Sequence, residues 1–263
     1  MQNIILFDTT GIHQEFLPLT FTRPVSDIRI GIFTIREKWE SRLPGIYSYD
    51  TADYLTVKYP MNIASNSFFI AGNVCPDEKL VAAISSLSEC ESLFYGSLDA
   101  FRKKDFGVKH TLNEEPFMIR KLYDIFLKNG EALEADYRYI VSSGKSEPLS
   151  ASNRVIGDPC FPDGTPKIFI EPGAVVECSA LNVTKGPVYI GKDAEIMEGV
   201  CIRAPFAACE HVVVNMGTKI YGATTLGPYC KVGGELNNVV MLAYSNKGHD
   251  GFLGNSVIGE WCN

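Results

Sequence analysis

The chain has 263 residues, which suggests one large domain or two modest ones. Hydrophobic residues make up 46% and charged residues 21%, as in ordinary soluble globular proteins, so wholesale disorder, collagen and coiled coil are excluded. The formal net charge is −7. An acidic surface repels phosphate backbones, so we expect no nucleic-acid partner.

The sequence shows neither a membrane segment nor an export signal. No apolar run approaches the ~18 residues of a membrane helix. The first residues carry no basic segment and only a short apolar run, so we expect no signal peptide. The eight cysteines form no C-x-x-C pair, which excludes a zinc ribbon. We therefore expect reduced thiols in a cytoplasmic protein with no membrane association.

The first 110 residues alternate between strand-like and helix-like segments. Residues 4–7 and 67–71 are short apolar runs that predict buried strands. Residues 77–87 repeat leucine and isoleucine at helical spacing, after a proline that suits a helix start. This alternation predicts an α/β domain over residues 1–110.

Residues 111–148 predict a helical connector. A first helix is expected over residues 113–129, with a capping asparagine at its start and Gly130 at the C′ position after it. A second short helix is expected over residues 131–139. The polar stretch 141–148 contains glycine and proline and is typical of a domain boundary.

After residue 150 the helical period disappears and an apolar residue recurs at every sixth position. The positions are Ile190, Ile196, Ile202, Ala208, Val214, Ile220, Leu226 and Val232. The positions four residues later are mostly apolar or small, and aliphatic–glycine pairs supply tight corners. A six-residue period predicts a parallel β-helix over residues 149–263. A β-sandwich is the alternative, although its strands show period two.

The segment 245–263 carries a family resemblance. His249, Gly254, Ile258 and Asn263 fall at the spacing of a histidine loop that leads into the next coil. The region resembles the hexapeptide-repeat acyltransferases, above all the acetyltransferase half of the bifunctional enzymes that make UDP-N-acetylglucosamine. This resemblance implies a left-handed parallel β-helix and a homotrimer with acyl-transfer sites between neighbouring helices. It also implies acetyl-CoA as co-substrate.

A second resemblance lies in residues 17–24, which read LPLTFTRP, and residues 34–40. They are similar to the L-x-P-L-T-x-x-R-P-K stretch of the sugar nucleotidyltransferases and to the segment after that stretch. The resemblance implies a nucleotidyltransferase-like α/β domain that takes a sugar phosphate, a nucleoside triphosphate and Mg²⁺. The two regions of resemblance are in the same order as in the bifunctional enzymes. The implied function is therefore synthesis of UDP-N-acetylglucosamine or a related amino-sugar nucleotide.

The acyltransferase resemblance makes His249 the candidate catalytic residue. Acyl transfer from a thioester to a sugar amine requires removal of an amine proton, and a neutral imidazole can accept that proton as a general base. The alternative for His249 is a solvated histidine in a glycine-rich turn. With only two histidines in the repeat region, a three-histidine zinc site is not expected.

Four further residues of the repeat region are candidate substrate contacts. Asn263 matches the asparagine that binds the hexosamine in the family, and its alternative is a corner residue in left-handed backbone. Lys247 would bind a phosphate as a point charge. Lys219 and Arg203 would meet a nucleotide diphosphate. The alternative for each of the three cations is a solvated charge.

In the N-terminal half, Arg23 and Thr20 are candidate phosphate contacts, since arginine pairs bidentately with phosphate oxygens. The alternative for Arg23 is a pairing with a loop carboxylate such as Asp27. Asp8 comes directly after the first predicted strand, where the ligand-binding loops of α/β folds lie, and is a candidate Mg²⁺ ligand.

Departures from both families keep a non-catalytic alternative open. Residues 7–16 replace the glycine-rich phosphate loop of the pyrophosphorylases and hold one glycine and no arginine. Val25 stands where that family has lysine, and residues 235–239 lack the lysines of the acyltransferases. The alternative is a nucleotide-sugar-binding or oligomerisation protein. Because the sequence ends in mid-coil, we also expect a β-helix truncated at its C-terminus.

Overall fold

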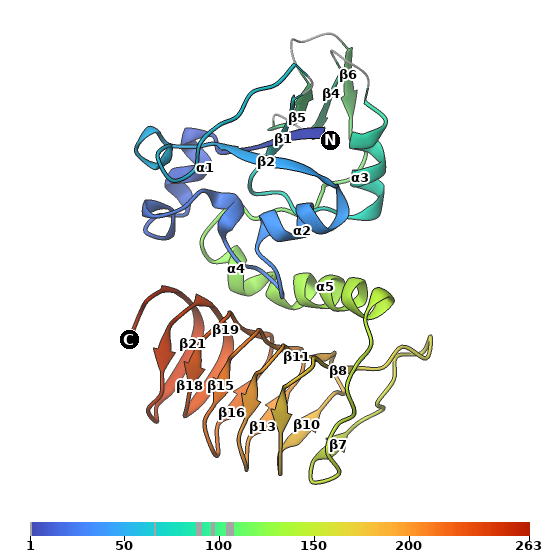
Figure 1. Ribbon diagram of the computed structural model, residues 1–263, viewed down its shortest axis with the longest axis vertical. Helices are drawn as coiled ribbons and strands as arrows, with labels where there is room; N and C mark the ends of the chain where they lie inside the picture. The colour runs from blue at the N-terminus through green and yellow to red at the C-terminus, as the bar shows by residue number, and fades with distance from the viewer. Residues whose placement is uncertain (1, 66, 88–90, 96–97, 104–107) are drawn as a thin grey trace. The chain divides into compact units, whose positions relative to one another are not determined.

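The computed structural model describes residues 2–65, 67–87, 91–95, 98–103 and 108–263. The chain divides into two compact units. Unit 1 comprises Met1–Ile28 and Phe33–Leu122, and unit 2 comprises Arg29–Ile32 and Tyr123–Asn263. Figure 1 shows a mixed sheet with helices in the first unit and a stack of short strands in the second. No helix in the described ranges is long and apolar enough to cross a membrane.

Unit 1 is built on a six-stranded sheet with the order β2-β1-β3-β5-β4-β6. Its strands are β1 (Gln2–Phe7), β2 (Gly45–Asp50), β3 (Ser67–Ala71), β4 (Glu91–Tyr95), β5 (Leu98–Lys103) and β6 (Val108–Thr111). Strand β1 runs parallel to both neighbours, and β5 runs antiparallel to β3 and β4. Ile4, Ile5 and Leu6 are all buried, because helices or loops cover both faces of a central parallel strand. The predicted α/β class and the strands at 4–7 and 67–71 are confirmed.

Three α-helices belong to unit 1, within its described residues: α1 (Thr10–Glu15), α2 (Ile35–Arg42) and α3 (Glu78–Ser85). Short 3-10 turns, η1 (Leu19–Phe21), η2 (Val25–Asp27) and η3 (Asp53–Leu55), connect them to the strands. A capping box formed by Thr34 and Glu37 starts α2. Asp77 caps α3, which buries Leu80 and Ile84. The predicted helix at 77–87 is confirmed with slightly shorter bounds.

The predicted helix at 113–129 is wrong. Only α4 (Asp124–Leu127) forms there, and the residues before it form bends, turns and an isolated bridge between Met118 and Val74. The N–H of Cys75 donates to the carbonyl of Phe117 at 2.8 Å, and the N–H of Ile119 donates to that of Asn73 at 3.0 Å. Tertiary pairing with the segment after β3 therefore outweighs the local helix propensity.

The second predicted helix is confirmed and is longer than expected. Helix α5 (Asn129–Ser143) extends the predicted 131–139 at both ends. Gly130 lies in the first turn of α5 rather than at a C′ position. A Cβ added at Gly130 would lie only 3.2 Å from the Cβ of Ala223. Close packing of α5 on the strands of unit 2 thus explains this glycine.

Unit 2 is a stack of coils whose strands form three columns. The first column contains β7 (Arg154–Ile156), β10 (Ala180–Asn182), β13 (Cys201–Arg203) and β16 (Lys219–Tyr221). The second column contains β8 (Ile168–Ile170), β11 (Val188–Ile190), β14 (Phe206–Ala208) and β17 (Thr224–Leu226). The third column contains β9 (Val175–Val176), β12 (Glu195–Ile196), β15 (Val213–Val214), β18 (Lys231–Val232) and β20 (Asn246–Lys247). The long strands β19 (Glu235–Ala243) and β21 (Phe252–Glu260) continue the first two columns.

The pairing within the columns is parallel and repeats along the chain. Phe206 pairs with Val188 on one side and with Thr224 on the other, each 18 residues away. Val213 pairs with Glu195 and Lys231 at the same interval. In this central part of the stack one coil therefore spans 18 residues, which is three periods of six.

The predicted burial at every sixth position is confirmed. All eight positions from Ile190 to Val232 are at most 1% exposed. The eight positions four residues later are buried as well, including the polar Thr218 and Thr224. Each six-residue repeat thus contributes two inward side chains to the core of unit 2.

Candidate functional site

The ends of three parallel strands define the first candidate site. Strands β1, β2 and β3 end at Phe7, Asp50 and Ala71, and backbone hydrogen bonds hold the next residues together. The N–H of Asp8 donates to the carbonyl of Asp50, and the N–H of Gly72 donates to that of Phe7, both at 2.8 Å. Ligands of open α/β sheets bind outside such carboxyl ends.

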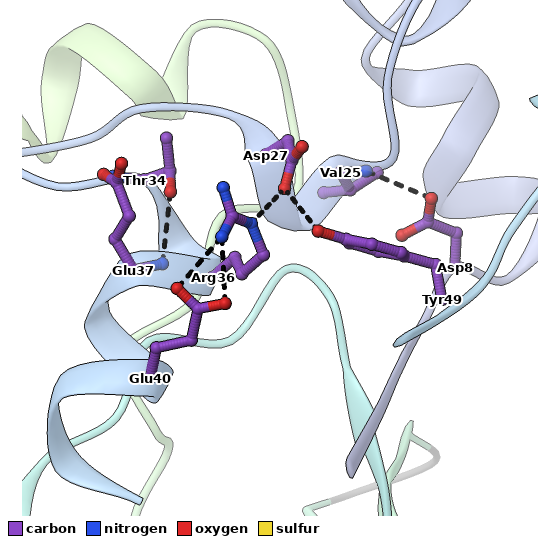
Figure 2. A network of polar contacts seen from close by, with 8 residues as sticks. All are labelled: Asp8, Val25, Asp27, Thr34, Arg36, Glu37, Glu40 and Tyr49. Atoms are coloured by element: carbon purple, nitrogen blue, oxygen red, sulfur yellow. Dashed lines mark hydrogen bonds and ion pairs between the residues drawn. The ribbon is translucent and has the colours of Figure 1, made fainter. Parts of the chain in front are cut away.

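Asp8 connects these strand ends to the loop that comes after α1. Its side chain is 1% exposed. The carboxylate oxygen Oδ2 accepts hydrogen bonds from the Val25 N–H at 3.0 Å and from the Thr51 hydroxyl at 2.8 Å. Figure 2 shows the contact with Val25. The carboxylate therefore fixes the start of η2 against the end of β2.

A resident Mg²⁺ does not fit the residues around Asp8. In the part of the chain that the structure describes, no group of three or more His, Cys, Asp and Glu side chains is suited to a metal ion. The Oδ1 atom of Asp8 lacks a hydrogen-bond partner, but a Cβ at Gly72 would lie only 2.7 Å from it. One enclosed oxygen is too little to hold an octahedral ion by itself.

His13 adds a polar chain to the site that the sequence analysis did not predict. Its Nδ1 lies 3.6 Å from Asp8 Oδ2, and its Nε2 lies 2.9 Å from the hydroxyl of Tyr54. That hydroxyl donates its proton to the carbonyl of Thr20, so it accepts a hydrogen bond from Nε2–H. His13 therefore connects the Asp8 carboxylate to the loop that carries Thr20.

The loop between α1 and η2 holds the predicted phosphate contacts. Thr20 is fully buried, and its hydroxyl donates to the carbonyl of His13 at 2.7 Å. Arg23 is 8% exposed, and its Nη2 lies 3.4 Å from the hydroxyl of the preceding Thr22. The side chain of Ser26 is fully buried without a hydrogen-bond partner. The loop thus buries three polar side chains, and the hydroxyl of Thr20 is already used to bond the loop to α1.

The carboxylate of Asp27 is paired with Arg36. Figure 2 shows Arg36 between two carboxylates. Its Nε lies 2.9 Å from Asp27 Oδ1, and its Nη1 lies 2.9 Å from Glu40. The hydroxyl of Tyr49 also donates to Asp27 Oδ1, at 3.4 Å. The guanidinium that makes this contact therefore comes from the first turn of α2, next to its capping box.

Burial governs the electrostatics of this network. It raises the pKa of Asp27 above the ordinary value, although the charge and hydrogen bond of Arg36 partly offset the effect. Burial likewise raises the pKa of Tyr49, and the nearby Asp27 carboxylate adds to the shift. Tyr49 therefore remains a neutral donor at physiological pH.

In unit 2 the loop after β20 carries the predicted histidine. His249 is exposed, and none of the hydrogen bonds and ion pairs among the described residues involves its imidazole. The ammonium of Lys247 donates to the carbonyls of Gly233 at 2.9 Å, His249 at 2.6 Å and Gly251 at 2.9 Å. The amide of Asn215 donates to the carbonyl of Gly248 at 3.0 Å. These contacts fix the loop and leave the imidazole accessible.

The remaining predicted contacts of unit 2 lie in two places. Asn263 accepts a hydrogen bond from the side-chain amide of Asn246 at 3.0 Å, so it lies beside the strand that leads into the His249 loop. Lys219 and Arg203 point outward from β16 and β13 and line a groove on the first column. The structure therefore groups Lys247 with His249 and groups Lys219 with Arg203.

A column of exposed rings also escaped the sequence analysis. Its members are His211, Tyr229, Tyr244 and Trp261, and each has a positive φ. Successive ring centroids are 4.6, 5.3 and 4.6 Å apart, and all three pairs are stacked. The ring spacing results from the corners of successive coils, so this column is a product of the coil repeat.

Comparison with known proteins addresses the N-terminal part of the chain. A family model described as sugar nucleotidyl transferase matches residues 4–145, which is more than half of the chain. A search of curated proteins finds no match. The matched range contains most of β1, the loop with Arg23 and the strand ends around Asp8. The chain belongs to the sugar nucleotidyl transferase family.

Proposed function

We propose that the protein catalyses a step of nucleotide-sugar biosynthesis at the strand ends of unit 1. In this step a phosphate oxygen of a sugar 1-phosphate attacks the α-phosphorus of a nucleoside triphosphate. The bond to the bridging oxygen breaks, and pyrophosphate leaves. The family match over residues 4–145 carries the proposal. The buried polar side chains around Asp8 support it, because they lie where α/β sheets bind ligands.

The residues of this site would have different tasks. Arg23 would contact phosphate oxygens through its guanidinium. Asp8 and Thr20 would be positioning residues. Asp8 accepts the N–H of Val25, two residues after Arg23, and Thr20 attaches the loop that carries Arg23 to the carbonyl of His13 in α1. Mg²⁺ that arrives with the nucleotide would neutralise phosphate charge, and we assign Asp8 no role as its ligand, because the one free oxygen of Asp8 lies against Gly72.

Activity assays on the full chain test this proposal. Pyrophosphate release would be measured with a panel of nucleoside triphosphates and sugar 1-phosphates, with Mg²⁺ present. Arg23→Ala should lower the rate by at least about 10²-fold, since it removes a charged contact to the transferring phosphates. Arg120→Ala is the matched control, because Arg120 pairs with Glu115 on the surface of the same unit. Specific binding of nucleotide sugars without turnover would instead favour the non-catalytic alternative.

A second candidate function is acyl transfer by unit 2. We infer it from the His249 loop, which three hydrogen bonds of Lys247 hold in place while the imidazole stays accessible. The amine of a hexosamine phosphate or nucleotide would attack the acetyl-CoA carbonyl, His249 would accept the amine proton, and the CoA thiolate would leave. In this proposal unit 2 is a left-handed β-helix, the assembly is a homotrimer, and the product belongs to UDP-N-acetylglucosamine synthesis.

The acyl-transfer proposal has its own assay. CoA release from acetyl-CoA would be measured with glucosamine 1-phosphate and with UDP-glucosamine as acceptors. His249→Ala should lower the rate by about 10²- to 10⁴-fold, which is the usual contribution of a general base. His211→Ala changes the other histidine of the coil stack and is the matched control. Equal rates for His249→Ala and the parent chain would reject His249 as the base.

A further inference from the structure

A groove of about 350 Å³ crosses the outward face of the first strand column of unit 2. Small residues form its floor, among them Ala180, Gly199 and Gly217. Longer outward side chains, including Ile156 and Tyr221, rise beside them. The hollow therefore results from small residues on neighbouring coils between larger ones.

Two cations line this groove. Cys201 and Lys219 are directly paired residues of β13 and β16, and Arg203 is two residues beyond Cys201 on the same face. Strand spacing and rise put the Cα atoms of Lys219 and Arg203 roughly 8 Å apart, which lets the two long side chains reach one ligand. Neither cation forms an ion pair within the described residues. Glu235 is paired with Lys219 in the sheet but does not line the groove.

The other lining groups suit a ligand that is anionic at one end and planar at the other. The amide of Asn182 lies in the same groove as the cations, and the ring of Tyr221 is 37% exposed. Arginine and lysine recognise phosphate oxygens, and an exposed aromatic ring stacks on a base. A basic groove on a chain of net charge −7 also marks a local preference for anions.

We propose that this groove binds a nucleoside diphosphate. Arg203 and Lys219 contact the diphosphate, and Tyr221 stacks on the base. The site is distinct from the strand ends of unit 1 and from the His249 loop, so its occupancy does not depend on either proposed reaction.

Cys201 provides a reporter inside the groove. Its thiol is exposed and lines the floor beside Lys219, whereas the exposed Cys262 lies outside the groove. Iodoacetamide labelling of the full chain, followed by peptide mass spectrometry, would measure both thiols at once. ADP at ten times its dissociation constant should slow alkylation of Cys201 about tenfold by occupancy and leave Cys262 unchanged. Inorganic pyrophosphate should protect more weakly, and adenosine least.

Charge reversal localises the protection. Arg203→Glu and Lys219→Glu should each raise the ADP concentration needed for protection at least about tenfold, because each removes a charge-assisted contact. Lys231→Glu is the matched control, since Lys231 points outward from β18 on another column. Unfolding midpoints would verify that the variants fold.

Two outcomes would overturn the proposal. One is equal labelling of Cys201 with and without ADP, or protection that survives both charge reversals. The other is a Cys201 thiol that does not react in the ligand-free protein but becomes reactive when the protein is diluted. Such a result would mean that a second copy of the chain covers this face. Pyrophosphate release at unit 1 is measured separately, so neither outcome bears on the proposed function.

Discussion

The two units use their buried residues in different ways. In unit 2 the buried side chains are almost all apolar and recur at fixed intervals, so each coil packs on the coil before it and the coil after it. In unit 1 a buried carboxylate, Asp8, links the ends of strands to Val25, which lies 17 residues later in the chain. The core of unit 2 thus repeats equivalent apolar positions, whereas unit 1 adds to its apolar core a polar group that joins distant segments. Substitutions in the two units should expose this difference.

The largest effect is expected from a cavity in the coil core. Ile220 is 1% exposed and lies between Ile202 and Leu236, its partners on neighbouring coils. Ile220→Ala should lower the free energy of unfolding by about 2–5 kcal/mol, since it removes buried methyl groups and leaves a cavity. Urea unfolding measures this change. Lys231→Ala, on an outward position, should change it by less than about 0.5 kcal/mol.

If unit 2 is built from equivalent positions, Ile202→Ala should cost a similar amount. A loss below about 1 kcal/mol at both sites would contradict the repeated core.

The second effect tests the polar link of unit 1. Asp8→Ala leaves the Val25 N–H and the Thr51 hydroxyl without their acceptor, so it should destabilise the protein by about 2–3 kcal/mol. Asp8→Asn keeps an oxygen acceptor of the same shape and should recover part of this loss. Urea unfolding followed by the fluorescence of Trp39, which is buried in unit 1, would report the transition of that unit. Equal losses for alanine and asparagine would mean that acceptor geometry is unimportant.

The sequence was informative where contacts are periodic. One period of six predicted the buried positions from Ile190 to Val232, because each coil repeats the same local geometry. The buried strands of unit 1 and the face of α3 were predicted from apolar runs and helical spacing in the same way. Periodic burial is a local property, so a single sequence reveals it.

Contacts between distant residues were not predictable. The non-helical conformation of residues 117–119 depends on partners more than 40 positions away, and this misled the helix prediction. The segment Arg29–Ile32 belongs to unit 2 because Asn129 and Asp136 accept its backbone N–H groups. Likewise, Arg36 was not expected beside Asp27. A local pattern carries no information on which distant side chain reaches a given carboxylate.

The third effect concerns the loop of His249. Lys247→Met keeps the length of the side chain but removes three hydrogen bonds to loop carbonyls. Because the lysine is partly exposed, the loss of stability should be only about 1–2 kcal/mol. Amide hydrogen exchange should rise in residues 248–251 and stay unchanged in β14. Lys192→Met, which changes an exposed corner lysine, is the control, and unchanged exchange in both variants would show that Lys247 does not hold the loop.

The smallest effect is a difference in pH dependence between the units. Burial raises the pKa of Asp27 above its ordinary value of 3.8, so the folded protein binds this proton more tightly than the unfolded chain does. The contribution of Asp27 to stability is therefore complete below pH 3.8 and is lost as the pH rises through the raised pKa. In unit 2, hydrogen bonds from Thr165 and Arg138 lower the pKa of Asp163 to about 2.

The contribution of Asp163 therefore has the opposite sign: it is present above pH 3.8 and is lost as the pH falls toward 2. Urea unfolding of Asp27→Asn and Asp163→Asn across this range would separate the two. Relative to its asparagine variant, the parent chain should lose stability with rising pH at Asp27 and gain it at Asp163. Slopes of the same sign would contradict the view that burial dominates at Asp27 and hydrogen bonding dominates at the exposed Asp163.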